Sequence, residues 1–171
     1  MYVGPFGAAT VGGIDPARTH LRPVLFVPGA GDDAYEYWRR LSAAWMTTET
    51  IVNVEHDMEC SQALVDELLA CPHPLCSHAY LMYLPRRYWA HGWASTDPRE
   101  RAQGGGIRWV ERGDERAGHS AIGFCKVEPR VRPGELERTE WPGVEMAVNR
   151  AVCGPWHLHW PGVEHYHKEP R

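Results

Sequence analysis

The sequence lacks a large excess of charge of either sign, and it lacks a long apolar run. Its formal net charge is −4 and its pI is about 6.2, so no basic field predicts general nucleic-acid binding. No apolar segment approaches the ~18 residues of a membrane-spanning helix, and the N-terminus lacks a charged start followed by an apolar stretch. We therefore expect a cytoplasmic protein with no membrane span, in which most of the five cysteines are reduced.

Two widespread catalytic motifs are also missing. There is no G-x-S-x-G sequence for a serine nucleophile, and the glycines at 104–106 are not followed by the Lys-Ser/Thr pair of a P-loop. The chain nevertheless has enough apolar material for a packed core, since 43% of its 171 residues are hydrophobic and eight are Trp. This length suits one compact domain.

The hydrophobic pattern predicts strands that alternate with helices. Apolar runs at 24–27 and 51–54 predict buried strands, and the segment between them predicts a helix over about 33–46 that Asp32 or Asp33 caps. Such a strand–helix–strand unit implies a parallel pair with a ligand crevice at the carboxyl ends of the strands. Later elements are expected at 62–70 (helix, capped by Ser61), 80–84 and 121–127 (strands), and from 141 to about 152 (helix).

These elements predict an α/β fold with a mixed sheet flanked by helices. We assign residues 1–22 to an N-terminal arm and residues 23–171 to a single domain. The polar segment 95–120 contains three consecutive glycines and many charges. It is expected to form a variable loop or hairpin that acts as a lid.

An acidic triplet follows the second predicted strand directly. The apolar run of residues 51–54 ends at Glu55-His56-Asp57. Two carboxylates one residue apart repel each other, and a hard divalent cation that also holds phosphate oxygens would relieve that repulsion. The alternative is a solvated acidic turn.

A histidine-rich segment lies near the C-terminus. Residues 157–167 hold four of the ten histidines, interleaved with Trp, Leu, Val and Tyr. Alternating histidines on an extended segment point to the same side, and neutral imidazole is a good ligand for borderline divalent metals. We expect His159 or His165 to complete a composite metal site with the acidic triplet.

A second group of metal-ligand residue types lies at 71–78. Cys71, His73, Cys76 and His78 occur within eight residues, separated by two prolines. Structural zinc sites usually combine two such clusters, and the chain has no second cysteine cluster. We therefore favour a packed loop with reduced thiols over a zinc site formed by Cys71 and Cys76.

Taken together, the motif "IVNVEHDM" and the elements after it resemble the catalytic domain of GT-A-fold glycosyltransferases. In that family an apolar strand leads into an Asp-x-Asp motif that holds a divalent cation against the diphosphate of a nucleotide-sugar donor. Glu55 replaces the usual first Asp here, and only 54 residues precede it, fewer than typical members use to build the nucleotide pocket. After the motif, members of this family continue with a helix, a strand, a variable region, a strand and a helix. The elements predicted for this chain follow the same order.

The resemblance implies a sugar transferase that uses Mn²⁺ or Mg²⁺. It implies Asp57 and Glu55 as metal ligands with His165 or His159, and Glu55, Asp32 and Asp33 near the donor. A base for an inverting reaction would come from one of four acidic residues, namely Asp97, Asp114, Glu140 and Glu145. Two alternatives remain open, a metal-dependent hydrolase or phosphodiesterase and a GT-A-like domain that binds without catalysis. The acceptor is not predicted.

Overall fold

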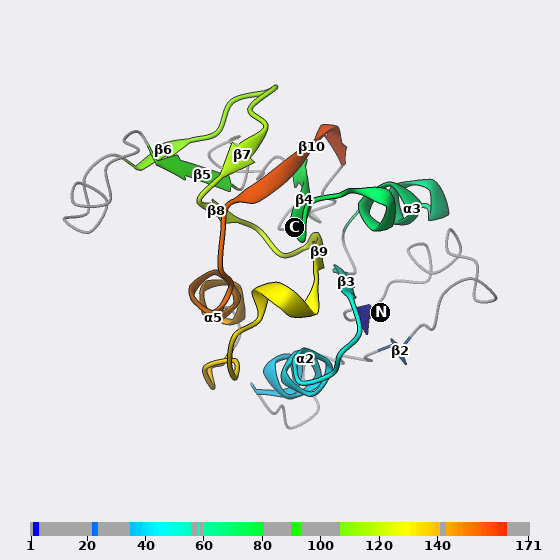
Figure 1. Cartoon of the computed structure of the whole chain (residues 1–171), viewed down its shortest axis with the longest axis vertical. Coiled ribbons are helices and arrows are strands. Elements are labelled where there is room, and N and C mark those ends of the chain that lie inside the picture. The colour runs from blue at the N-terminus through cyan, green and yellow to red at the C-terminus, as the bar shows by residue number, and fades with distance from the viewer. Residues whose placement is uncertain are drawn as a thin grey trace, which may run out of the picture.

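The fold is built on a seven-stranded sheet with the order β2-β1-β3-β9-β4-β10-β7 (Figure 1). The structure, a computed structural model, describes residues 2–3, 22–23, 35–55, 58, 60–80, 90–93, 107–140 and 143–163. The sheet strands are β1 (Tyr2–Val3), β2 (Arg22–Pro23), β3 (Ile51–Val54), β4 (Leu75–Tyr80), β7 (Arg116–Ala117), β9 (Phe124–Val127) and β10 (Trp156–Val163). A smaller sheet contains β5 (Ala90–Trp93), β6 (Ile107–Trp109) and β8 (His119–Ser120).

The main sheet is mixed, and its strand directions place several carboxyl ends at one edge. Strands β2, β1 and β3 are parallel, and β10 is parallel to β4. Strand β9 runs antiparallel between β3 and β4, so β3 and β4 point the same way. The carboxyl ends of β3, β4 and β10 therefore share an edge with the start of β9. We call it the carboxyl edge.

Three described α-helices flank this sheet, namely α2 (Glu36–Trp45), α3 (Gln62–Ala70) and α5 (Val144–Ala151). Helices α2 and α5 pack with one set of sheet residues, including Ile51 and Trp156, in one buried cluster. Helix α3 packs with the alternate residues, including Val52 and Phe124, in a second cluster. Because successive strand residues point to opposite faces, α2 and α5 cover one face and α3 covers the other. The predicted α/β fold with a mixed sheet is confirmed.

Helix α3 was predicted at its observed bounds. It begins after Ser61, whose Oγ accepts a hydrogen bond from the Leu64 amide at 3.4 Å. Its buried side chains are Val65 and Leu68, whereas Leu69 is 46% exposed. Helix α2 begins after Tyr35, so the expected caps at positions 32 and 33 lie outside its observed start and outside the described residues.

Three other expectations change in the structure. Strand β4 covers Leu75–Tyr80, so the expected loop at 71–78 is strand from Leu75 onward, and residues 81–84 of the strand expected at 80–84 lie outside the described residues. The described half of segment 95–120 is not one loop, since it contains β6, β7 and β8. The strand expected at 121–127 begins at Phe124. The predicted strand at 24–27 and residues 95–106 lie outside the described residues.

Candidate functional site

Glu55 lies at the carboxyl edge, directly after β3. Its backbone N–H donates a hydrogen bond to the Gly123 carbonyl at 2.7 Å, which extends the pairing of β3 with β9 by one residue. The Met58 amide donates to the Glu55 carbonyl at 3.2 Å, and the Met58 side chain is buried. The backbone on both sides of the first carboxylate of the acidic triplet is therefore anchored.

The Glu55 side chain is held on the α2 face of the sheet. The Tyr37 hydroxyl, from the first turn of α2, donates to Oε1 of Glu55 at 3.2 Å. That hydroxyl accepts a hydrogen bond from Nδ2 of Asn53 at 2.9 Å, and the same Asn53 amide donates to the Ile122 carbonyl. Since Asn53 and Tyr37 are both buried, this chain of hydrogen bonds fixes the direction of the carboxylate.

Tyr80, the last residue of β4, lies near Glu55 at the carboxyl edge. A Cβ atom added at Gly123 would lie 2.6 Å from the Tyr80 hydroxyl oxygen and 3.1 Å from Oε2 of Glu55. Both side chains therefore close over the start of β9, where only a glycine leaves room for them.

Two carboxylates give this edge a negative field. Burial raises the pKa of the Tyr80 phenol well above its ordinary value, and the charges of Glu55 and Glu145 raise it further. Burial also raises the pKa of the Cys125 thiol, with smaller contributions from Cys76, Glu55 and Glu145. Glu145, in the first turn of α5, therefore acts on the same two groups as Glu55. Carboxylate oxygens are ligands that suit a hard divalent cation.

The other described base candidates lie in different surroundings. Oδ2 of Asp114 accepts a hydrogen bond from the Glu111 amide at 2.8 Å, which stabilises a turn. Glu140 is exposed and hydrogen-bonds to Tyr35, whose pKa it raises. Of the described candidates, Glu145 is therefore the one that the electrostatics place with Glu55. Five predicted site residues lie outside the described residues, namely Asp32, Asp33, Asp57, Asp97 and His165.

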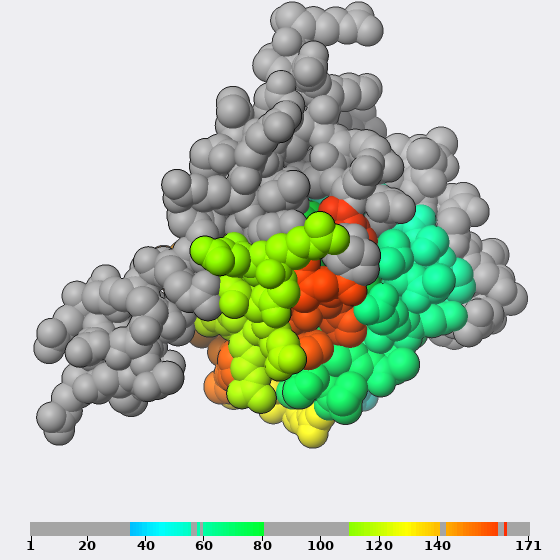
Figure 2. All heavy atoms as spheres, turned by 90° about the horizontal axis from the view of Figure 1, so that it is seen from above, coloured from blue at the N-terminus to red at the C-terminus, as the bar shows by residue number. Residues whose placement is uncertain are grey.

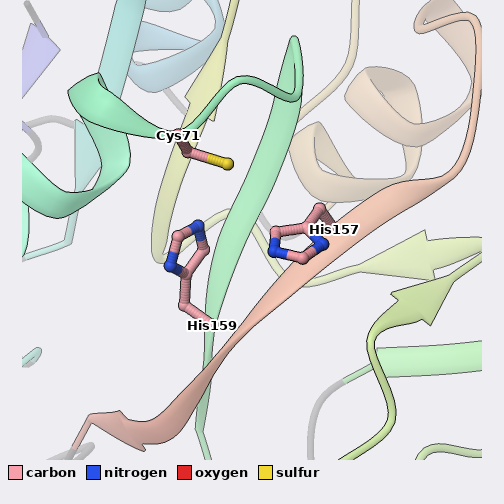
Figure 3. Close-up of side chains that lie close together, drawn as sticks. All are labelled: Cys71, His157 and His159. Atoms are coloured by element: carbon pink, nitrogen blue, oxygen red, sulfur yellow. The ribbon is translucent and has the colours of Figure 1, made fainter.

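His159 belongs to a different group of side chains. The ligand atoms of Cys71, His157 and His159 lie within 4.8 Å of one another. Figure 3 shows the Cys71 sulfur and the two imidazoles, which come from alternate positions on β10, turned toward a common space. The expected alternation of His157 and His159 on one side of an extended segment is confirmed. We call these three residues the Cys/His cluster.

Polar and aromatic neighbours orient both imidazoles. Nδ1 of His159 lies 2.7 Å from Oε1 of Glu67 on α3. The His157 ring stacks on His73 with centroids 4.3 Å apart. The pKa of His157 is lowered, chiefly because of burial and secondarily by His73 and His159. Neutral imidazole, the form that binds metals, is thereby favoured at His157.

The sheet separates the Cys/His cluster from Glu55. His159 contacts α3 through Glu67, whereas Glu55 contacts α2 through Tyr37, and α2 and α3 lie on opposite faces. The structure therefore does not bring His159 together with Glu55 in the composite site that was expected. In Figure 2, β10 (orange-red) is visible between α3 (teal) and the segment 110–120 (yellow-green).

Sequence reasoning named His159 but missed His157 and Cys71 as its partners. The available signal was the His-x-His alternation at 157 and 159 together with the cysteine that ends α3. What the sequence did not reveal is the parallel pairing of β10 with β4, in which His157 is opposite Cys76 and His159 is opposite His78.

Among the described residues, no helix has both the length and the apolar character needed to cross a bilayer.

Comparisons with protein-family models, with curated proteins and with solved structures found no match.

Proposed function

We propose that this protein is a GT-A-like glycosyltransferase that moves a sugar from a nucleotide-sugar donor with the help of a divalent cation. The observation that supports the proposal most is the place of Glu55. It is the first carboxylate of an acid-x-acid triplet, and it follows a parallel strand at the carboxyl edge of an α/β sheet. Ligands of open α/β sheets bind at this edge.

The order of elements after the acidic triplet supports the same reading. Helix α3, strand β4, the segment that contains β5 to β8, strand β9 and helix α5 follow in that order. This is the order of helix, strand, variable region, strand and helix on which the resemblance to the family rests. Strand β9 runs antiparallel between β3 and β4, which point the same way. The chain therefore returns to the carboxyl edge, where β9 begins beside Glu55.

Glu55 and Asp57 are the proposed ligands of the cation, which when bound would neutralise charge on the leaving diphosphate. Glu55 suits this role because Tyr37 fixes its carboxylate on one side while a buried core supports the strand. Tyr80 remains protonated and polar at the edge of the donor site, because burial and two carboxylates oppose its ionisation. Glu145 is the proposed base that receives the proton of the acceptor.

A thermal-shift panel of nucleotide sugars, with and without Mn²⁺, tests this proposal first. We expect at least one nucleotide sugar to raise the melting temperature only when Mn²⁺ is present, since the cation links the carboxylates to the diphosphate. Inorganic pyrophosphate with Mn²⁺ is the matched control for binding of the diphosphate alone. No shift with any donor would contradict the proposal, and turnover of a donor with water as the sole acceptor would favour a hydrolase.

A further inference from the structure

The Cys/His cluster is a preorganised group of soft and borderline ligands on the α3 face of the sheet. It contains one sulfur and two imidazoles whose ligand atoms lie within 4.8 Å of one another. A tetrahedral zinc site with Zn–S near 2.3 Å and Zn–N near 2.05 Å has ligand atoms roughly 3.3–3.6 Å apart. Small side-chain rotations would therefore suffice to close the cluster around an ion.

His159 has the hydrogen bonding of a metal-bound histidine. Glu67 holds Nδ1 at 2.7 Å, and Nε2 is buried with no hydrogen-bond partner in the part of the chain that the structure describes. In Figure 3 one ring nitrogen of His159 is directed toward the Cys71 sulfur. A carboxylate on one nitrogen and a metal on the other is the usual arrangement around zinc, and a buried nitrogen without a partner is otherwise costly.

Cys71 is equally well placed, because its backbone is anchored on both sides. Its N–H donates to the Glu67 and Leu68 carbonyls at the end of α3, and its carbonyl accepts a hydrogen bond from Lys126 at 2.6 Å. The Lys126 side chain is only 1% exposed and also forms an ion pair with Glu128 at 3.2 Å, so this hydrogen bond holds the Cys71 backbone firmly against β9.

We propose that Cys71, His157 and His159 bind one zinc ion, with water in the fourth position. The ion would tie the C-terminal strand β10 to the end of α3, two segments that are far apart in the sequence. A thiolate with two imidazoles selects zinc and its soft relatives over Mn²⁺ and Mg²⁺, which prefer oxygen ligands. The site is thus distinct in place and in chemistry from the carboxyl edge, and it does not depend on the proposed sugar transfer.

Cobalt substitution tests the site directly. The purified full chain is freed of metal under reducing conditions and titrated with Co²⁺, and the sulfur-to-cobalt charge-transfer band is recorded. We expect one equivalent of Co²⁺ to bind and to give this band. Added Zn²⁺ should displace the Co²⁺ and abolish the band. Cys71→Ser should abolish the band, and His159→Ala should weaken binding by at least about tenfold. Glu67→Gln, an exposed change that leaves the ligands intact, should weaken it by about 10–100-fold.

Two control variants make the result specific. Cys153→Ser removes an exposed thiol outside the cluster, and Glu55→Gln removes a ligand of the proposed Mn²⁺ site. Both should bind Co²⁺ like the parent chain, and circular dichroism verifies the fold of every variant. The proposal is overturned if the parent chain shows no charge-transfer band, if the band survives in Cys71→Ser, or if Cys153→Ser removes it. Loss of the band in Glu55→Gln would equally contradict it.

Discussion

Replacing Gly123 by alanine should disturb the carboxyl edge. The added Cβ would lie 2.6 Å from the Tyr80 hydroxyl and 3.1 Å from Oε2 of Glu55, well inside ordinary contact. Tyr80 is 4% exposed, so its ring has little room to retreat, and its hydroxyl bears the larger clash. Overpacking of this kind costs about 1–3 kcal/mol, which for a chain of this size lowers Tm by about 2–12 °C.

A double-mutant cycle locates the clash. Tyr80→Phe removes the oxygen nearest to the new Cβ, so Gly123→Ala should cost less in that background, with a coupling energy of about 0.5–3 kcal/mol. Gly134→Ala is the matched control, because a Cβ there meets no atom within 4 Å. Urea denaturation monitored by circular dichroism gives the four stabilities. The described packing of Tyr80 and Glu55 over the start of β9 is wrong if Gly123→Ala lowers the free energy of unfolding no more than Gly134→Ala does. It is also wrong if Tyr80→Phe leaves the effect of Gly123→Ala unchanged.

Three further changes test buried polar groups of the fold. Lys126→Met should cost about 1–3 kcal/mol in urea denaturation, because the buried Cys71 carbonyl loses its donor; an unchanged midpoint would contradict this. Arg132→Lys should cost about 1–3 kcal/mol, because one ammonium group replaces a guanidinium that donates to three carbonyls, whereas the exposed Arg130→Lys should cost little. Burial raises the pKa of the Cys60 thiol to about 12, so between about pH 9 and 12 the unfolded chain has released a proton that the folded chain keeps. Stability should therefore fall with rising pH by about 1.4 kcal/mol per unit from this thiol, and a Cys60→Ala variant should show a shallower slope.

The local elements with clear end signals were predictable from the sequence. Strand β3 is a run of β-branched residues, interrupted only by Asn53, that ends at a charge, and α3 has a serine cap at its start. Most of strand β4 was predicted as a loop because Ser77 and His78 interrupt its apolar pattern. Both are buried, with Ser77 Oγ donating to backbone carbonyls and His78 hydrogen-bonded to the Leu64 carbonyl. Polar residues satisfied in this way hide a buried strand from pattern reasoning.

The sites depend on contacts between distant segments, and this limited their prediction. The place of Glu55 at a strand end followed from one short segment, and so did the alternation of His157 and His159. The link between His159 and Glu67 requires the pairing of β10 with β4 and the packing of α3 on that face, which no local pattern encodes. The separation of His159 from Glu55 by the sheet has the same origin.

The most direct test of the proposed sugar transfer is calorimetric titration of Mn²⁺ and a nucleotide-sugar donor into the parent chain and isosteric variants. Glu55→Gln and Asp57→Asn keep the size of each side chain but remove a charge from the acidic triplet. Glu49→Gln, an exposed acid before the start of β3, is the matched control. We predict that Mn²⁺ affinity falls at least about tenfold, or ~1.4 kcal/mol, in both triplet variants, that donor binding falls with it, and that Glu49→Gln matches the parent. Parent-like binding of Mn²⁺ and donor by Glu55→Gln and Asp57→Asn would contradict the account.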